Sequence, residues 1–154
     1  MVKVREASKK WGIWLIFAMF VCLMTPSVRA DEKKVISSID AASSNCKGVS
    51  QKIFDYKELG QQESKSSQLL MEELRNLGYK VSGDLKVPAD LVKDGISKTA
   101  FRAELAGKGP GPTITIMLEY DALKNGHACG HNLIGVAAVG AGIALSKVVS
   151  RHGL

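Results

Sequence analysis

Residues 113–119 read Thr-Ile-Thr-Ile-Met-Leu-Glu, and residues 119–132 continue as Glu-Tyr-Asp-Ala-Leu-Lys-Asn-Gly-His-Ala-Cys-Gly-His-Asn. The first run is rich in apolar and β-branched residues, which is typical of a strand buried on both faces. We therefore predict a central strand at 113–119. The second run places two acids, two histidines and a cysteine directly after that strand. Because functional sites in α/β sheets gather beyond the carboxyl ends of strands, residues 119–132 are the predicted functional loop.

The helix predicted at 133–150 is made of unusually small residues, since Gly135, Gly140 and Gly142 alternate with alanines. Each glycine costs a helix roughly 0.5–1 kcal/mol relative to alanine. A helix tolerates that cost where its backbone lies close against another element, and we predict such packing here. A membrane helix pair has a similar composition, but the basic residues that close this segment disfavour it.

The preceding chain alternates between helical and extended patterns. Apolar residues recur at helical spacing over 35–59, and again over 64–77, where Gly78 is a natural C-terminal cap. An extended stretch is predicted from 79–81, and a strand with one buried face over 99–105. Helices and strands in this order, without an internal repeat, indicate the α/β class.

The chain has 154 residues, which suits one domain with one core. Its net charge is +6, but residues 1–30 hold five basic residues and one acid, so residues 31–154 carry only +2. A charge this small gives no electrostatic case for binding to a polyanion, and we expect no nucleic-acid partner.

The first thirty residues have the organisation of a signal peptide. A basic segment at 1–10 precedes fourteen apolar residues at 11–24, and Pro26 follows. Fourteen residues are fewer than the roughly twenty that a spanning helix needs. Val28 and Ala30 supply compact side chains for a signal peptidase, so we predict cleavage after Ala30 and secretion. The alternative is an uncleaved signal anchor that holds the protein in a membrane.

Cys129 and His131 are the strongest candidates for metal ligands. A thiolate and an imidazole suit zinc or a similar transition metal, and glycines at 126 and 130 let the backbone fold tightly around an ion. A structural zinc finger draws two pairs of ligands from two places, and the sequence has no second pair. A disulfide between Cys46 and Cys129 is the alternative use of this thiol.

Three motifs surround these candidate ligands: Glu-Tyr-Asp-Ala-Leu at 119–123, Gly-His-Ala-Cys-Gly-His-Asn-Leu-Ile-Gly at 126–135 and Ala-Ala-Val-Gly-Ala-Gly-Ile-Ala-Leu at 137–145. Together they closely resemble the metallopeptidase family M-twenty. Within it they are most similar to the amidohydrolase branch, which includes aminobenzoyl-glutamate hydrolase, the auxin-conjugate amidohydrolases and the M-twenty domain-containing dipeptidases. The segment 58–67 also resembles that family's N-terminal helix pair.

This resemblance implies a zinc-exopeptidase-like α/β/α sandwich. Residues 31–154 would form the N-terminal portion of its catalytic domain. The family inserts a lid, which is also its dimerisation domain, later in the chain, and that domain is absent from this sequence. A homodimer is therefore expected only of a full-length form.

Carried over position by position, the resemblance implies that Cys129 and His131 bind the metal and that Asp121 accepts a hydrogen bond from a ligand. His127 and Glu119 are further possible ligands. The implied metal is a divalent transition ion, with zinc, manganese and cobalt as candidates. The implied substrate is a dipeptide or an N-acyl amino acid whose amide bond is hydrolysed.

The family completes its metal centre with a pair of glutamates and further histidines downstream, but only His152 remains downstream here. We therefore expect this chain alone to lack hydrolase activity. The alternative is a truncated secreted product that binds a metal or a partner without turnover. Lys124-Asn125 also replaces the proline of the family pattern, a change that concerns the shape of the loop and leaves the ligands in place.

Overall fold

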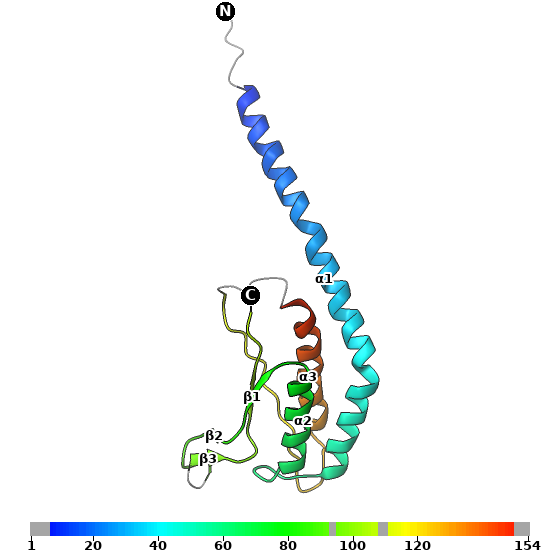
Figure 1. The fold of residues 1–154 in the computed structure, drawn as a ribbon, viewed down its shortest axis with the longest axis vertical. Helices are drawn as coiled ribbons and strands as arrows, with labels where there is room; N and C mark the ends of the chain where they lie inside the picture. The colour runs from blue at the N-terminus through cyan, green and yellow to red at the C-terminus, as the bar shows by residue number, and fades with distance from the viewer. Residues whose placement is uncertain (1–6, 93–94, 108–110, 150–154) are drawn as a thin grey trace, which may run out of the picture.

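The structure is a computed structural model that describes residues 7–92, 95–107 and 111–149, and of residues 7–30 the backbone alone. In this part of the chain three helices and four short strands follow one another: α1 (Ala7–Tyr56), α2 (Ser64–Asn76), β1 (Lys80–Ser82), β2 (Leu85–Lys86), β3 (Ile96–Ser97), β4 (Arg102–Glu104) and α3 (His131–Val148). Figure 1 shows α2 and α3 beside the C-terminal half of α1. The predicted α/β class is confirmed, whereas the three-layer sandwich stays a prediction.

α1 is one uninterrupted helix that contains most of the helical pattern predicted over 35–59. It also runs through Ala30, so the backbone marks no boundary at the predicted cleavage position. The side chains of residues 1–30 lie outside the described part of the structure. The signal peptide, its alternative as a membrane anchor and secretion therefore stay predictions.

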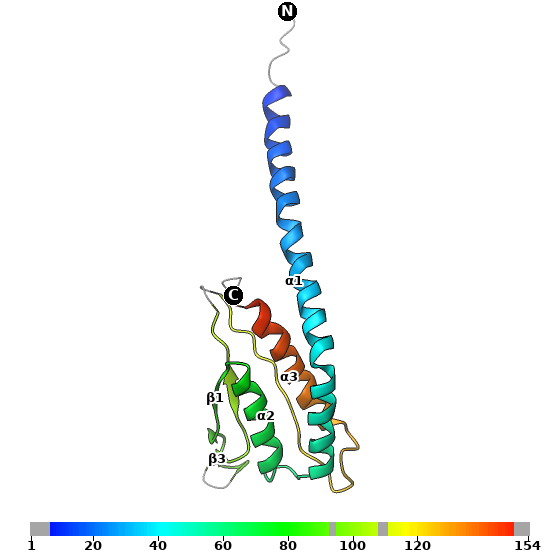
Figure 2. The same ribbon diagram turned by 45° about the vertical axis from the view of Figure 1, so that its right-hand side comes forward.

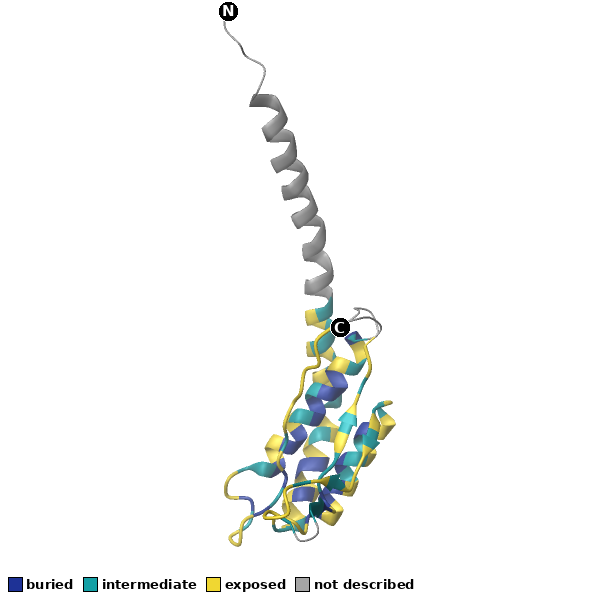
Figure 3. Cartoon of the chain, turned by 90° about the vertical axis from the view of Figure 1, so that its left-hand side faces the viewer, coloured by how far each residue is buried: buried dark blue, intermediate teal, exposed yellow. Residues whose placement is uncertain are grey.

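α3 lies at the centre of the core and packs most extensively against α1, as the views in Figures 1 and 2 show. The core joins the three helices to the segment that precedes the predicted functional loop. Its buried members are Val49, Ile53, Leu70, Leu74, Tyr120, Val136, Val139 and Ile143. Buried residues concentrate at this helix junction in Figure 3, and yellow exposed residues cover the periphery.

Two glycines of α3 lie where no side chain fits easily, which confirms the predicted close packing. A Cβ atom at Gly135 would lie 3.0 Å from the carbonyl oxygen of Glu119. A Cβ atom at Gly142 would lie 3.3 Å from both Leu74 and the Tyr79 hydroxyl. That hydroxyl donates a hydrogen bond of 2.9 Å to the Gly142 carbonyl oxygen. α3 thus lies against α2 and against the segment that carries Glu119.

Gly135→Ala should lower the free energy of unfolding by about 1–3 kcal/mol, because the added methyl group meets a backbone atom that cannot rotate away. Gly140→Ala is the matched control. A Cβ atom there meets the Cys46 sulfur at 3.9 Å, an ordinary contact, so a gain of up to about 1 kcal/mol in helix propensity is expected. Urea denaturation followed by circular dichroism compares the two variants. Equal stability would show that α3 does not depend on the close approach at Gly135.

α2 confirms the second predicted helix and its glycine cap. Leu77 is the C-cap, and Gly78 follows in the left-handed region with a φ of 87°. The N–H of Gly78 bonds to the Arg75 carbonyl at 2.9 Å, and the N–H of Tyr79 bonds to the Leu74 carbonyl at 3.1 Å. This is a Schellman motif, which satisfies two carbonyls at the end of the helix.

The strands form two separate antiparallel pairs, β1 with β4 and β2 with β3. β1 confirms the extended stretch predicted from 79–81. In its pairing with β4, Val81 lies opposite Ala103, and both side chains are partly buried against the core. The strand predicted over 99–105 is shorter than expected, since only its centre at 102–104 is paired.

The prediction of a buried central strand at 113–119 is wrong. These residues form no regular secondary structure, and Ile114 and Met117 are 75% and 86% exposed. A strand needs a neighbour to accept and donate its backbone hydrogen bonds, and the four strands in the described residues pair with one another elsewhere. Apolar composition predicted burial here, but burial also requires a partner on each side. Only the end of the segment, at Leu118 and Tyr120, packs against the core.

Among the described residues, α3 has the length and hydropathy of a membrane-spanning helix. In the structure 44% of it is buried. Its contacts with α1 and α2 place the buried residues in the protein core. Core helices often share the composition of membrane helices, so packing accounts for the apolar character of α3.

Candidate functional site

His131, the first residue of α3, lies between two carboxylates. Its Nδ1 atom is 2.7 Å from Oδ1 of Asp121, and its Nε2 atom is 3.0 Å from Oε2 of Glu119. The side chain of His131 is 20% exposed, and those of Asp121 and Glu119 are 29% and 64% exposed. The structure therefore brings together three of the five residues predicted for the site.

The two contacts make different demands on the imidazole. A neutral imidazole carries one N–H, so it can donate to only one of the two carboxylates. Asp121 is the closer and more buried acceptor, which favours a proton on Nδ1. Nε2 then presents a lone pair toward the exposed Glu119 carboxylate. Two atoms with lone pairs at 3.0 Å need a positive group between them, which is either a second proton or a metal cation.

The backbone around Asp121 is held from two sides. The N–H of Ala122 donates a bond of 2.6 Å to the carbonyl oxygen of Glu58, in the loop between α1 and α2. Leu123 and Gly126 then exchange backbone hydrogen bonds of 3.0 and 2.8 Å, which close a tight turn. Gly126 adopts a φ of 87° in that turn, a conformation that favours glycine. The turn sends the chain back toward α3 and places His131 opposite Asp121.

Cys129 is exposed and its thiol is free. Cys46 on α1 is partly buried and also free, so the alternative Cys46–Cys129 disulfide is not formed in this structure. Burial, with a smaller contribution from the charge of Glu73, raises the pKa of the Cys46 thiol. Of these two thiols, the one predicted as a metal ligand is therefore the more accessible to solvent.

His127 is buried against α1. Its Nε2 atom lies 3.0 Å from the carbonyl oxygen of Ile53, and its ring stacks on Phe54 with 5.9 Å between centroids. Its Nδ1 atom is buried without a hydrogen-bond partner. Asn132 also bonds to α1, since its Nδ2 atom donates to Oγ of Ser50 at 3.0 Å. These contacts anchor the functional loop on α1, and a ligand role for His127 stays a prediction.

The described residues do not assemble a complete metal site. Across 7–92, 95–107 and 111–149, no three His, Cys, Asp or Glu side chains are arranged to hold one ion. The ring nitrogens of His131 face the two carboxylates, and the thiol of Cys129 is exposed. The donor types do fit a transition metal, because a thiolate, an imidazole and carboxylates lie in one short loop.

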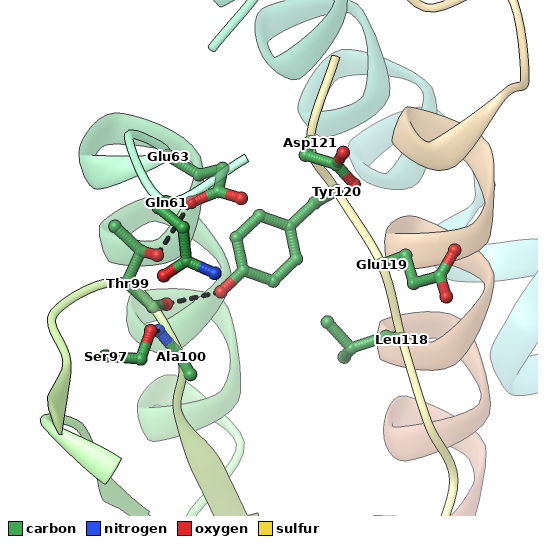
Figure 4. Close-up of a pocket in the computed structure, with 9 residues that line it drawn as sticks. All are labelled: Gln61, Glu63, Ser97, Thr99, Ala100, Leu118, Glu119, Tyr120 and Asp121. Carbon is green, nitrogen blue, oxygen red and sulfur yellow. Dashed lines mark hydrogen bonds between the residues drawn. The ribbon is translucent and has the colours of Figure 1, made fainter. Parts of the chain in front are cut away.

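An open depression of about 190 Å³ adjoins the two carboxylates. Figure 4 shows Tyr120 pointing toward Thr99 on one side and Glu119 pointing toward α3 on the other. The residues that line the depression are Gln61, Glu63, Ser97, Thr99, Ala100, Leu118, Glu119, Tyr120 and Asp121.

A buried chain of hydrogen bonds forms one wall of this depression. The Tyr120 hydroxyl donates to the Thr99 carbonyl oxygen, and the Thr99 hydroxyl donates to Oε2 of Glu63 at 2.6 Å. Glu63 is only 8% exposed. Burial, then the charges of Glu63 and Asp121, raise the pKa of Tyr120, so its hydroxyl stays protonated as a donor. Thr99 and Glu63 are 36 residues apart, and no sequence pattern indicated their contact.

No protein-family model matches the chain. A curated protein does, one of the subunits of p-aminobenzoyl-glutamate hydrolase from Escherichia coli (strain K12), which is 30% identical over 134 residues. The chain is related to an amidohydrolase. The match covers 75% of this chain and 26% of the relative, so the chain spans about a quarter of the length of the protein it matches. The similarity supports an amidohydrolase-related family.

Proposed function

We propose that residues 31–154 are the N-terminal part of a catalytic domain of the M-twenty metallopeptidase family, in its amidohydrolase branch. The reaction is metal-dependent hydrolysis of an amide bond in a dipeptide or an N-acyl amino acid. Cys129 and His131 are the metal ligands that this chain contributes. The observation that carries the proposal is the hydrogen bond of 2.7 Å between Asp121 and Nδ1 of His131.

Metal-binding histidines usually donate their second ring N–H to a carboxylate, which fixes the tautomer and makes the ligating nitrogen more basic. Asp121 has this relation to His131, and it leaves Nε2 as the ligating atom. The Glu119 carboxylate already lies against Nε2 and is largely exposed, so it is free to rotate when a cation enters. The exposed thiol of Cys129 lies two residues before His131 in the same loop.

A bound divalent metal, with zinc, manganese and cobalt as candidates, would polarise the amide carbonyl and make water a stronger acid. The chain's own residues orient the ligand and border the substrate. The depression of about 190 Å³ beside Asp121 and Glu119 is smaller than a typical pocket for a whole ligand. We infer that it takes one end of a dipeptide-sized substrate, with the other end bound by residues outside this chain.

A second candidate function is a secreted product that binds a metal or a partner without turnover. This alternative is favoured by one observation, that the described residues bring no three ligands around one point. Both candidates predict metal binding at Cys129 and His131, and they differ in turnover.

Thiol labelling with and without zinc tests the metal site. Zinc should slow the labelling of Cys129 by at least about tenfold, because a coordinated thiolate is shielded from reagents. Cys46 is an internal control, since it lies on α1, is partly buried and has a raised pKa. Peptide mass spectrometry of the full chain follows each cysteine separately.

A further inference from the structure

The loop that joins α1 to α2 is held in an unusual backbone conformation. Lys57 and Gln61, which bracket Glu58, have φ angles of 51° and 69°. Non-glycine residues seldom adopt this left-handed region, and such strain persists only where surrounding contacts hold it. Two residues of this kind within five positions indicate that the loop is shaped by its contacts.

The side chain of Glu58 supplies three of those contacts. Its carboxylate accepts hydrogen bonds from the N–H of Lys65 at 2.9 Å and from the N–H and hydroxyl of Ser66, both at 2.8 Å. The N-cap residue of α2, Glu63, makes no capping hydrogen bond with its side chain. Glu58 therefore caps α2 from outside the helix. Burial by itself raises the pKa of Glu58, but these hydrogen bonds outweigh it and hold the pKa below its usual value.

The backbone of the same residue reaches the candidate site. The carbonyl oxygen of Glu58 accepts the bond of 2.6 Å from Ala122, the residue after Asp121. Leu59 and Ala122 form an isolated parallel bridge. A Cβ atom at Gly60 would lie 3.8 Å from Oδ2 of Asp121, the carboxylate oxygen that does not face His131. The loop therefore touches both the backbone beside Asp121 and the back of its carboxylate.

We propose that Glu58 is a positioning residue, which holds the Asp121 carboxylate against Nδ1 of His131 by fixing the loop on α2. The side-chain bonds tie the loop to the start of α2, and the carbonyl bond transmits that position to Ala122. When the carboxylate is lost, the strained loop relaxes and Asp121 shifts with it. The role in a metal site rests on the function proposed above, but the effect on the imidazole does not.

The test compares Glu58→Gln with Glu73→Gln in the full, metal-free chain. The glutamine at 58 removes the charge and keeps one acceptor oxygen, so the three bonds from Lys65 and Ser66 cannot all persist. The control removes the same charge from α2, where Glu73 accepts a hydrogen bond of 2.8 Å from Asn45. NMR chemical shifts of the imidazole nitrogens at about pH 9, where an ordinary histidine is neutral, report which nitrogen carries the proton.

In the unmodified chain and in Glu73→Gln, the Nδ1-protonated form of His131 should predominate. Glu58→Gln should lower the ratio of the two tautomers by at least about fivefold, because a charge-assisted hydrogen bond is weakened. In an Asp121→Asn background, Glu58→Gln should cause no further change, since its effect passes through Asp121. The chain has three histidines, so the signal of His131 is assigned by its loss in His131→Ala.

An unchanged tautomer ratio in Glu58→Gln, together with lower stability, would overturn the proposal and leave Glu58 as a helix cap alone. If Glu58→Gln does not fold, Ser66→Ala decides. It removes one of the three bonds and should shift the ratio in the same direction by a smaller factor, and no shift would count against the proposal. A shifted ratio in a chain that binds no metal would contradict the proposed function and leave the positioning role intact.

Discussion

Asp121→Asn should weaken zinc binding by the full chain by about 10–100-fold, the usual cost of losing a carboxylate that orients a metal-binding histidine. Asparagine keeps the shape of the side chain but removes the charge that faces Nδ1 of His131 at 2.7 Å. The imidazole then loses its preferred tautomer, and Nε2 becomes a weaker donor to the metal. Competition against a chromophoric chelator measures the zinc affinity directly.

Asp55→Asn is the matched control for this experiment. Asp55 is exposed on α1, and its carboxylate accepts a hydrogen bond of 2.9 Å from Gln51. It removes the same charge without touching the loop that holds His131. Equal zinc affinity in Asp55→Asn and Asp121→Asn would show that Asp121 does not orient a ligand. His131→Ala provides the lower limit, since it removes the ligating nitrogen itself.

The 154-residue chain alone should not hydrolyse amide bonds, with any of zinc, manganese or cobalt. A catalytic metal uses about three protein ligands and an open position for water. Cys129 and His131 supply two. Asp121 is engaged with Nδ1 of His131, which leaves no evident general base, and that contribution is typically worth about 10²–10⁴ in rate.

A panel of dipeptides and N-acyl amino acids, assayed with each metal, measures this prediction. Heat-denatured protein with the same metal gives the background rate. Turnover above that background that disappears in Cys129→Ala would contradict the prediction, and it would show that this chain carries a working site. Turnover that survives in Cys129→Ala would point to a contaminating enzyme.

Local patterns predicted the helices well, because each helix satisfies its backbone hydrogen bonds within itself. The apolar spacing of α2 and Gly78 at its end sufficed to place both the helix and its cap. The same holds for α3, where glycine positions also predicted the close approach at Gly135. The segment 113–119 failed for the converse reason, because a strand depends on partners that a local pattern does not contain.

The site was predictable to the extent that it is local. Glu119, Asp121 and His131 lie within thirteen residues, and the turn between them carries a glycine signal at Gly126. The contacts that hold the site are long-range. Glu58 reaches Ala122 across more than sixty residues, and no composition or spacing indicates such a bond. Sequence reasoning therefore identified the chemistry of the site and missed its supports.

The most direct test of the central claim is the rate at which Cys129 is labelled in the presence of zinc. Cys129 as a ligand should become at least about tenfold slower to react when zinc is added, and a chelator should restore the original rate. Labelling of Cys46 should not change. In His131→Ala, the protection of Cys129 should be lost, because the two residues share one ion. Equal labelling of Cys129 with and without zinc would contradict the account.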